Sequence, residues 1–233
     1  RRRDDGALAG LAWLEGDAPR GMAVRLARWD GLRWAPAETV AAPGPGSQLA
    51  LVATALADGT LLLAWSAFDG SDDEVVWSRR DGDAWSRPER IAADNAVPDV
   101  TPALVAVDGG ALAAWATFAD GAYRVVLARY ADGRWSAPRP VAPPGTAFPG
   151  FEPATVAPRL LVRRAAPAGW LLIELDAEHR PVRQAMAEGT GSVRPSIVED
   201  VGDGVHFVWA GSDLVPYGAW EAPERRATPE TAP

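Results

Sequence analysis

The sequence predicts an all-β fold, a β-propeller of about five four-stranded sheets (blades), and three observations support this prediction. First, tryptophan pairs recur along the chain: Trp13 with Trp34, Trp65 with Trp85, and Trp115 with Trp135. Second, their first members are spaced by 52 and then 50 residues, a period typical of one supersecondary unit that needs neighbours to bury its apolar face. Third, Asp-Gly pairs, a strong hairpin signal, separate short apolar runs, and 21 prolines and 23 glycines interrupt the chain.

The third copy of the repeat shows the four strands most clearly. The last run contains prolines, which suit the outer edge of a sheet because proline has no N–H group to donate to a neighbouring strand. We expect the strands of this copy, from the innermost outward, at residues 101–107, 111–118, 123–130 and 135–141. The second copy repeats the order at residues 48–56, 60–68, 74–80 and 84–92.

The other three copies are less complete. The first copy matches only the second, third and fourth strands, at residues 7–15, 22–29 and 33–41. A degenerate fourth copy starts at Glu152 and has expected strands at 159–164, 170–175 and 182–186. We therefore expect one propeller domain over residues 1–220, with blades at 7–42, 48–92, 101–142, 152–187 and 194–220, followed by a disordered tail at 221–233.

Two structural alternatives stay open. A two-sheet sandwich is also built from short strands of this kind. In addition, the first copy lacks an innermost strand and the fifth lacks a clear outermost strand. This pattern fits a five-bladed ring with an irregular seam, and it equally fits a piece of a six-bladed ring.

The composition excludes several classes of function. The formal net charge is -8 at pH 7, so we expect no nucleic-acid partner. All 23 basic residues are arginines, which excludes lysine chemistry, and the absence of cysteine excludes thiol nucleophiles, disulfides and thiolate metal sites. No apolar run reaches the roughly 18 residues of a transmembrane segment, and no signal peptide is visible in this chain. We expect a monomer.

The hairpin between the third and fourth strands carries a recognisable motif. It reads Trp-Asp-Gly-Leu-Arg-Trp at 29–34, Arg-Asp-Gly-Asp-Ala-Trp at 80–85 and Tyr-Ala-Asp-Gly-Arg-Trp at 130–135. Two copies continue as Trp-Ser-x-Pro. The motif resembles the Asp-box (BNR repeat) of the sialidase-like β-propeller superfamily, although aspartate and glycine are adjacent here and the step to tryptophan is shorter. In that family the motif is structural and lies on the face away from the active site.

The resemblance implies a function related to glycans. Sialidases similar to this fold use an arginine triad, a tyrosine nucleophile paired with a glutamate, and an aspartate acid/base. This full set is not found in the sequence, so catalytic residues stay unassigned. We expect a non-catalytic propeller that binds a glycan or protein ligand on one face; the alternative is a divergent glycoside hydrolase, a sialidase-like exo-glycosidase. The resemblance also implies an extracytoplasmic location, whether periplasmic, secreted or lipid-anchored.

Candidate ligand-binding residues come from the loops around a propeller's channel. Loops that enter the innermost strands and loops that join second to third strands share one face. Carboxylates there suit sugar hydroxyls, and an arginine can grip a carboxylate with two hydrogen bonds. Solvated turn residues and salt bridges between blades are the alternative explanation. The candidates are Asp69, Asp99, Asp120, Glu152, Arg194 and Tyr217.

Two further expectations concern metals and aromatic residues. Asp69, Ser71 and Asp73 alternate as the ligands of a hard-cation loop do, so calcium is the one cofactor that the pattern suggests. Most tryptophans keep the register of the repeat and are expected to pack between blades. Trp170 and Trp220 fall outside that register and are expected at the surface.

Overall fold

The structure, a computed structural model, describes residues 10–17, 21–44, 46, 48–152, 157–188, 193–195, 197–202, 204–209 and 217–222. Within these residues the regular secondary structure is entirely β and forms five antiparallel sheets. The predicted all-β fold class is therefore confirmed. The described residues include no helix with the length and apolar character that crossing a membrane requires. The predicted tail lies, from residue 223 onward, outside the described residues.

The sheets take their strands in chain order. The first contains β1 (Gly10–Asp17), β2 (Gly21–Arg28) and β3 (Glu38–Ala41). The second contains β4 (Gln48–Ala55), β5 (Leu61–Phe68), β6 (Asp73–Asp81), β7 (Ala84–Trp85) and β8 (Glu89–Arg90). The third contains β9 (Asp99–Val107), β10 (Gly110–Ala119), β11 (Ala122–Ala131), β12 (Arg134–Trp135) and β13 (Arg139–Pro140). The fourth contains β14 (Thr146–Glu152), β15 (Arg159–Arg164), β16 (Gly169–Leu175) and β17 (Pro181–Glu188). The fifth contains β18 (Ile197–Val201), β19 (Gly204–Val208) and β20 (Tyr217–Ala219).

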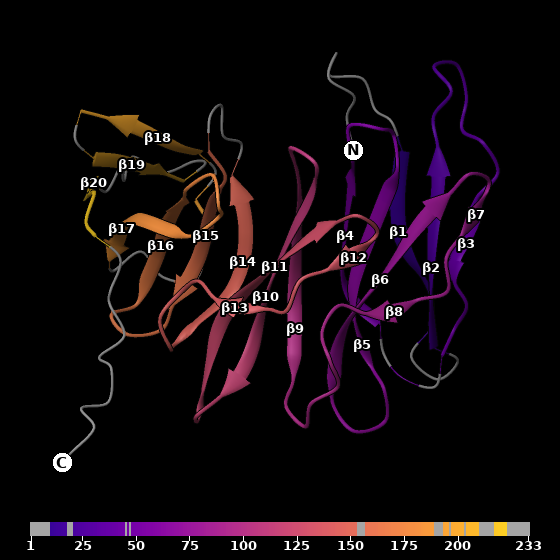
Figure 1. Cartoon of the computed structure of the whole chain (residues 1–233), viewed down its shortest axis with the longest axis horizontal. Helices are drawn as coiled ribbons and strands as arrows, with labels where there is room; N and C mark the ends of the chain where they lie inside the picture. Colours follow the sequence, from indigo (N-terminus) through magenta and orange to yellow (C-terminus); the bar gives the residue numbers. More distant parts are fainter. Residues whose placement is uncertain are drawn as a thin grey trace.

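The sheets follow one another along the longest axis of the molecule, so the first and the fifth lie at opposite ends (Figure 1). The innermost strands β4, β9 and β14 contact one another in turn. In the first sheet, β1 takes the place of the second strands β5 and β10, as the sequence predicts, and the described residues there include no innermost strand. Strands β18 and β19 run across the direction of the other strands, so the fifth sheet is tilted relative to its neighbours (Figure 1).

The outer strands of the second and third sheets are each split into two short pieces, at the prolines that the sequence places on the outer edge. A serine completes the hydrogen bonding at each split. Ser86 N–H donates to the Arg79 carbonyl at 2.8 Å, and Arg79 N–H donates to Ser86 Oγ at 3.1 Å. The same two bonds join Ser136 to Arg129, at 2.8 and 3.0 Å. The serine hydroxyl therefore replaces a backbone carbonyl that the bent strand no longer supplies.

Tryptophans fill the space between sheets, as predicted. Trp65 and Trp115 are each only 1% exposed. Trp77 of β6 meets Tyr130 and Trp135 of the third sheet edge-on, with ring centroids 5.2 and 5.8 Å apart. Such edge-on aromatic pairs add about 0.5–1.5 kcal/mol to the stabilisation from area burial.

The expectation that Trp170 lies at the surface is wrong. Its side chain is 3% exposed and packs with Phe207 between the fourth and fifth sheets. The fifth sheet provides this cover although its sequence has lost the repeat signature. Trp220 is half-buried and is covered by the guanidinium of Arg183, which lies 4.0 Å from its ring centroid.

The expectation that the fourth unit begins at Glu152 is also wrong. Its innermost strand is β14, which begins at Thr146 and ends at Glu152. Phe148 has a φ of 51°, and the pairing of β14 with β15 shifts in the middle of the strand. This bulge accommodates Pro149, which interrupts the alternating pattern and hides the strand in the sequence.

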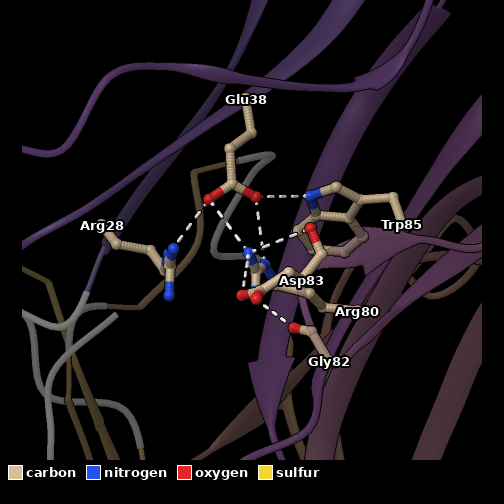
Figure 2. Close-up of polar contacts among 6 residues, drawn as sticks. All are labelled: Arg28, Glu38, Arg80, Gly82, Asp83 and Trp85. Carbon is tan, nitrogen blue, oxygen red and sulfur yellow. Dashed lines mark hydrogen bonds and ion pairs between the residues drawn. The ribbon is translucent and has the colours of Figure 1, made fainter.

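Glu38 of β3 links the first sheet to the second (Figure 2). Its Oε2 accepts hydrogen bonds from Arg80 Nε and Trp85 Nε1 of the second sheet, each at 3.0 Å. Its Oε1 accepts a bond from Arg28 Nε of its own sheet at 3.1 Å. Burial alone would raise the pKa of Glu38, but its bonds to Arg80 and Trp85 and the charge of Arg28 hold that pKa below its usual value.

We predict that Glu38→Gln lowers the free energy of unfolding at neutral pH by about 1–2 kcal/mol, because the largely buried Arg80 then loses its hydrogen-bonded carboxylate. A carboxyl with a lowered folded-state pKa stabilises the fold above its unfolded pKa and loses that contribution as the pH falls. The difference from the wild type should therefore shrink as the pH falls below 4.5, the ordinary glutamate value. Urea unfolding across this pH range measures the effect.

Asp83→Asn is the matched control for this prediction. Asp83 lies 3.6 Å from the same arginine, but its side chain is fully exposed. Its removal should change stability little, since exposed ion pairs contribute about 0–1 kcal/mol. Equal losses in the two variants would contradict the role assigned to Glu38.

Candidate functional site

The predicted site residues are divided between the two ends of the sheets. Asp69, Asp99 and Asp120 lie at the end where second strands turn into third strands, here called the rim, which is the lower edge in Figure 1. Glu152 lies at the opposite end, where β14 leads towards β15, and Arg194 forms an ion pair with it.

The expectation that all six residues share one face is therefore wrong. Its cause is the misplaced start of the fourth unit: Glu152 ends an innermost strand and does not precede one. The contact with Arg194 is the salt bridge between blades that the sequence left as the alternative. The side chain of Tyr217 lies outside the described residues.

Asp120 belongs to a tight turn at the rim. Asp120 and Gly121 have φ values of 53° and 79°, as in the two-residue hairpin turns that favour this dipeptide. The Asp120 carboxylate forms an ion pair with Arg124. These contacts account for the residue as a structural element of the β10–β11 hairpin.

Four carboxyl groups gather at the rim between the second and third sheets: Asp69, Asp72, Glu74 and Asp99, here called the acidic cluster. Asp69 and Asp72 stand in the turn between β5 and β6, Glu74 follows in β6, and Asp99 begins β9. One carboxylate oxygen from each of Asp69, Asp72 and Glu74 lies within 4.8 Å of the other two. Asp99 is close enough to Glu74 for its charge to raise the pKa of Glu74.

The carboxylate oxygens that lie together in this loop are not all from the residues predicted to bind a cation. Ser71 and Asp72 donate their backbone N–H groups to Asp69 Oδ1, at 2.8 and 3.3 Å, which orders the turn. Asp73 begins β6, where successive side chains point to opposite faces of the sheet, so Glu74 and not Asp73 joins the group. The alternating spacing in the sequence therefore identifies the loop, but Asp72 and Glu74 stand beside Asp69 in place of the predicted Ser71 and Asp73.

Asp69 is held by hydrogen bonds from its own turn and from Arg90. Arg90 donates to Asp69 Oδ2 at 2.6 Å and reaches Asp94 at 3.1 Å. The backbone hydrogen bonds to Asp69, from Ser71 above all, and the bond from Arg90 hold the pKa of Asp69 below its usual value. Asp69 is therefore ionised at neutral pH.

The buried members of the acidic cluster behave in the opposite way. Glu74 and Asp99 are 1% and 2% exposed. Burial raises the pKa of Glu74 to about 7, and the negative charge of Asp99 adds to this effect. Burial also raises the pKa of Asp99, although its carboxylate accepts a hydrogen bond from Asn95 Nδ2 at 3.3 Å.

A groove of about 860 Å³ lies between the third and fourth sheets, at the end opposite to the rim. The third sheet contributes residues 105–108 and Arg129, and the fourth contributes Phe151, Glu152 and the hairpin at 176–179. Of the predicted candidates, Glu152 is the one that lines this groove.

The groove lies where the repeat signature is lost. Between the second and third sheets, Tyr130 and Trp135 of an outer hairpin pack against Trp77. The corresponding hairpin of the fourth sheet, residues 176–180, carries no tryptophan or tyrosine, and a larger space remains beside it. The cavity at the matching place between the second and third sheets measures about 530 Å³.

The polar wall of the groove is held in place by arginines. Asp176 accepts hydrogen bonds from Arg180 N–H and Nε, at 2.7 and 2.9 Å, and Arg180 also binds Glu178 at 2.8 Å. Arg139 of the third sheet donates to the carbonyl oxygens of Glu178 and His179, which anchors the hairpin across the groove. These bonds fix the position of the 176–179 hairpin at the groove.

Sequence reasoning missed most of these residues. Arg129 NH2 donates to the Asp108 carbonyl at 3.3 Å, and Arg129 lines the groove. Burial and the positive charges of Arg129 and Arg139 lower the pKa of His179, so its imidazole is neutral at pH 7. The groove could have been predicted from one feature of the sequence. The fourth copy lacks the pair of aromatic residues that fills the corresponding space between the second and third sheets.

No model of a known protein family matches the chain, and no curated protein matches it. Solved structures do match. The polysaccharide lyase Uly1 has a TM-score of 0.55 and 13% identity, and the match covers 95% of this chain and 57% of that protein. The GH32 β-fructofuranosidase BmSUC1 of Bombyx mori has a TM-score of 0.52 and 12% identity, with 91% and 56% covered. A thermostable family-43 glycoside hydrolase has a TM-score of 0.49 and 12% identity, with 80% and 73% covered.

These likenesses establish the fold alone, because identity is low throughout. The chain spans just over half the length of the lyase and of the fructofuranosidase. The fold of the described residues resembles that of the lyase and of the fructofuranosidase. The resemblance to sialidase-like propellers is thus supported as far as the propeller fold, and no family model assigns BNR repeats to the chain.

We predict that Glu74→Gln raises the melting temperature at about pH 8 in the presence of a chelator, because the buried carboxylate beside Asp99 is then neutral. A carboxyl whose folded-state pKa is raised stabilises the fold fully below its unfolded pKa, and this contribution is lost as the pH rises through about 7. The gain should therefore vanish near pH 4.5, the ordinary glutamate value. Each kcal/mol corresponds to roughly 2–4 °C in a domain of this size.

Calorimetry across this pH range measures the effect. Glu89→Gln is the control, because Glu89 is an exposed carboxyl in β8 of the same sheet. It should leave the pH dependence unchanged. A Glu74→Gln variant with the pH profile of the wild type would contradict the raised pKa.

Proposed function

We propose that the protein binds a neutral glycan in the groove between the third and fourth sheets and does not hydrolyse it. The observation that carries this proposal is the groove itself, a space of about 860 Å³ lined by an aromatic ring, an arginine and several carboxylates. Ligand sites of about 300–1,000 Å³ commonly combine apolar walls with a few fixed polar groups.

The chemistry of the groove suits sugar hydroxyls, which both donate and accept hydrogen bonds. The carboxylates of Asp108, Glu152 and Asp176 offer acceptors, Arg129 offers donors, and Phe151 offers an apolar surface for a sugar ring. With Arg180 and Arg194, which pair with lining carboxylates, the described part of the groove has four carboxylates and three arginines, so it offers no positive excess to an anionic sugar such as sialic acid. The preferred ligand class is therefore a neutral oligosaccharide.

The structural neighbours support a carbohydrate ligand. Uly1 is named as a polysaccharide lyase and BmSUC1 as a β-fructofuranosidase, and both resemble this chain over nine-tenths or more of its length. The same neighbours favour a second candidate, glycoside hydrolysis in the groove. We further propose an extracytoplasmic location, where a protein of this kind would meet polysaccharides.

Hydrolysis requires one protonated carboxyl as general acid and one ionised carboxylate as base or nucleophile. The hydrogen bond from the Arg180 backbone above all lowers the pKa of Asp176, which favours its ionised form, and Glu152 forms an ion pair with Arg194. Asp108 and Glu178 are the other described carboxyls of the groove and are the candidates for the acid. The named activities of the structural neighbours back the hydrolase alternative better than binding alone, whereas the ion pairs of Glu152 and Asp176 support binding without catalysis.

We predict that Arg129→Gln weakens binding of neutral oligosaccharides about tenfold, because the loss of one charge-assisted hydrogen bond costs about 1.4 kcal/mol. A glycan array with neutral and sialylated members identifies the ligand, and isothermal titration measures its affinity. Arg87→Gln, at an exposed arginine of the second sheet, is the control and should bind normally. Equal affinity in both variants, or selective binding of sialylated glycans, would contradict the proposal.

Turnover assays separate the two candidates. We expect no release of product from aryl glycosides, including a sialoside, by protein that binds a glycan. Measurable turnover that is lost in Asp108→Asn, with binding retained, would replace the binding function with the hydrolase.

A further inference from the structure

The acidic cluster has the geometry of a cation site. One oxygen from each of Asp69, Asp72 and Glu74 lies within 4.8 Å of the other two. Oxygen ligands of one Ca²⁺ ion lie about 2.3–2.6 Å from it, so any two of them are at most about 5 Å apart. The three oxygens are therefore close enough to share a single ion.

Buried oxygens without partners provide a second, independent observation. Glu74 is 1% exposed, and its Oε1 has no hydrogen-bond partner among the described residues. The same holds for three more buried oxygens, which also have no hydrogen-bond partner among the described residues: both carboxylate oxygens of Asp72, and Oδ1 of the neighbouring Asp99. Buried polar atoms in folded proteins nearly always have a partner, because an unpaired one costs several kcal/mol.

The protein's own cations do not satisfy these oxygens. Arg90 is bonded to Asp69 and Asp94, and it has no hydrogen bond to the unpartnered atoms of Asp72 and Glu74. The cluster thus contains more carboxylates than its neighbouring arginine can neutralise.

We propose that Asp69, Asp72 and Glu74 bind a divalent cation of the calcium type at the rim. The ligands are carboxylate oxygens alone, which suit hard cations and not the softer transition metals. Calcium also tolerates irregular coordination, whereas Mg²⁺ demands a near-ideal octahedron. The ion would stabilise the β5–β6 turn and screen Glu74 from Asp99, where the second sheet meets the start of β9.

Calcium titration of the chelator-treated protein at about pH 7.5 tests this proposal, with CaCl₂ alone as the probe. We expect saturable heat of binding and a rise in melting temperature that grows with calcium concentration, as for any ligand specific to the folded state. Mg²⁺ should produce a smaller rise at the same concentration. Asp72→Asn and Glu74→Gln should each lose most of the calcium-dependent rise.

Two controls make the test specific to this site. Asp120→Asn removes a rim carboxylate outside the cluster, and Glu89→Gln removes an exposed carboxylate of the same sheet; both should respond to calcium as the wild type does. If Glu74→Gln does not fold, Asp72→Asn alone decides, because Asp72 lies in a turn and is only partly buried.

The proposal is overturned if the wild type shows neither heat nor a change in melting temperature up to millimolar calcium, the weakest range of natural calcium modules. It is equally overturned if Asp72→Asn and Glu74→Gln respond to calcium as the wild type does, since the ion then binds elsewhere. Neither outcome depends on glycan binding, because the groove lies at the other end of the sheets.

Discussion

Each sheet of this protein is a single layer of strands, with too little apolar volume to form a core alone. The fold therefore depends on contact between the faces of successive sheets. Large side chains such as Trp65 and Trp115 occupy these contacts and are almost wholly buried. Glu38 adds a polar connection between the first two sheets. Wherever such filling side chains are absent, the same architecture leaves open space, and the groove between the third and fourth sheets is the result.

Features that depend on local sequence could be predicted. The Asp-Gly turns, the prolines of the outer strands and the tryptophan period all act within one hairpin, so they predict strand order in the second and third sheets. The start of the fourth sheet could not be predicted, because the bulge around Pro149 interrupts the alternation of β14. Burial of Trp170 depends on its packing against Phe207 of the fifth sheet, a long-range contact that no local pattern encodes.

Some residues of the candidate sites could also be predicted from the sequence, whereas others could not. Topology alone places Asp69 and Asp99 together at the rim, since loop positions follow from strand order. The participation of Glu74 depends on its burial beside Asp99, which requires the packed structure. The groove was harder still, because it arises from side chains that the fourth hairpin lacks. A degenerate copy in a repeat protein is therefore a useful place to look for a site.

The broken outer strands have a consequence for behaviour at high concentration. A continuous exposed edge invites a strand from another molecule to pair with it and start aggregation. The second and third sheets present only two-residue pieces such as β7 and β8, too short to template such an addition. The fourth sheet has an unbroken outer strand, β17, but Gln184 in it exchanges backbone hydrogen bonds of 2.8 and 2.7 Å with Glu221. The chain's own final described segment thus occupies the place that a foreign strand would take.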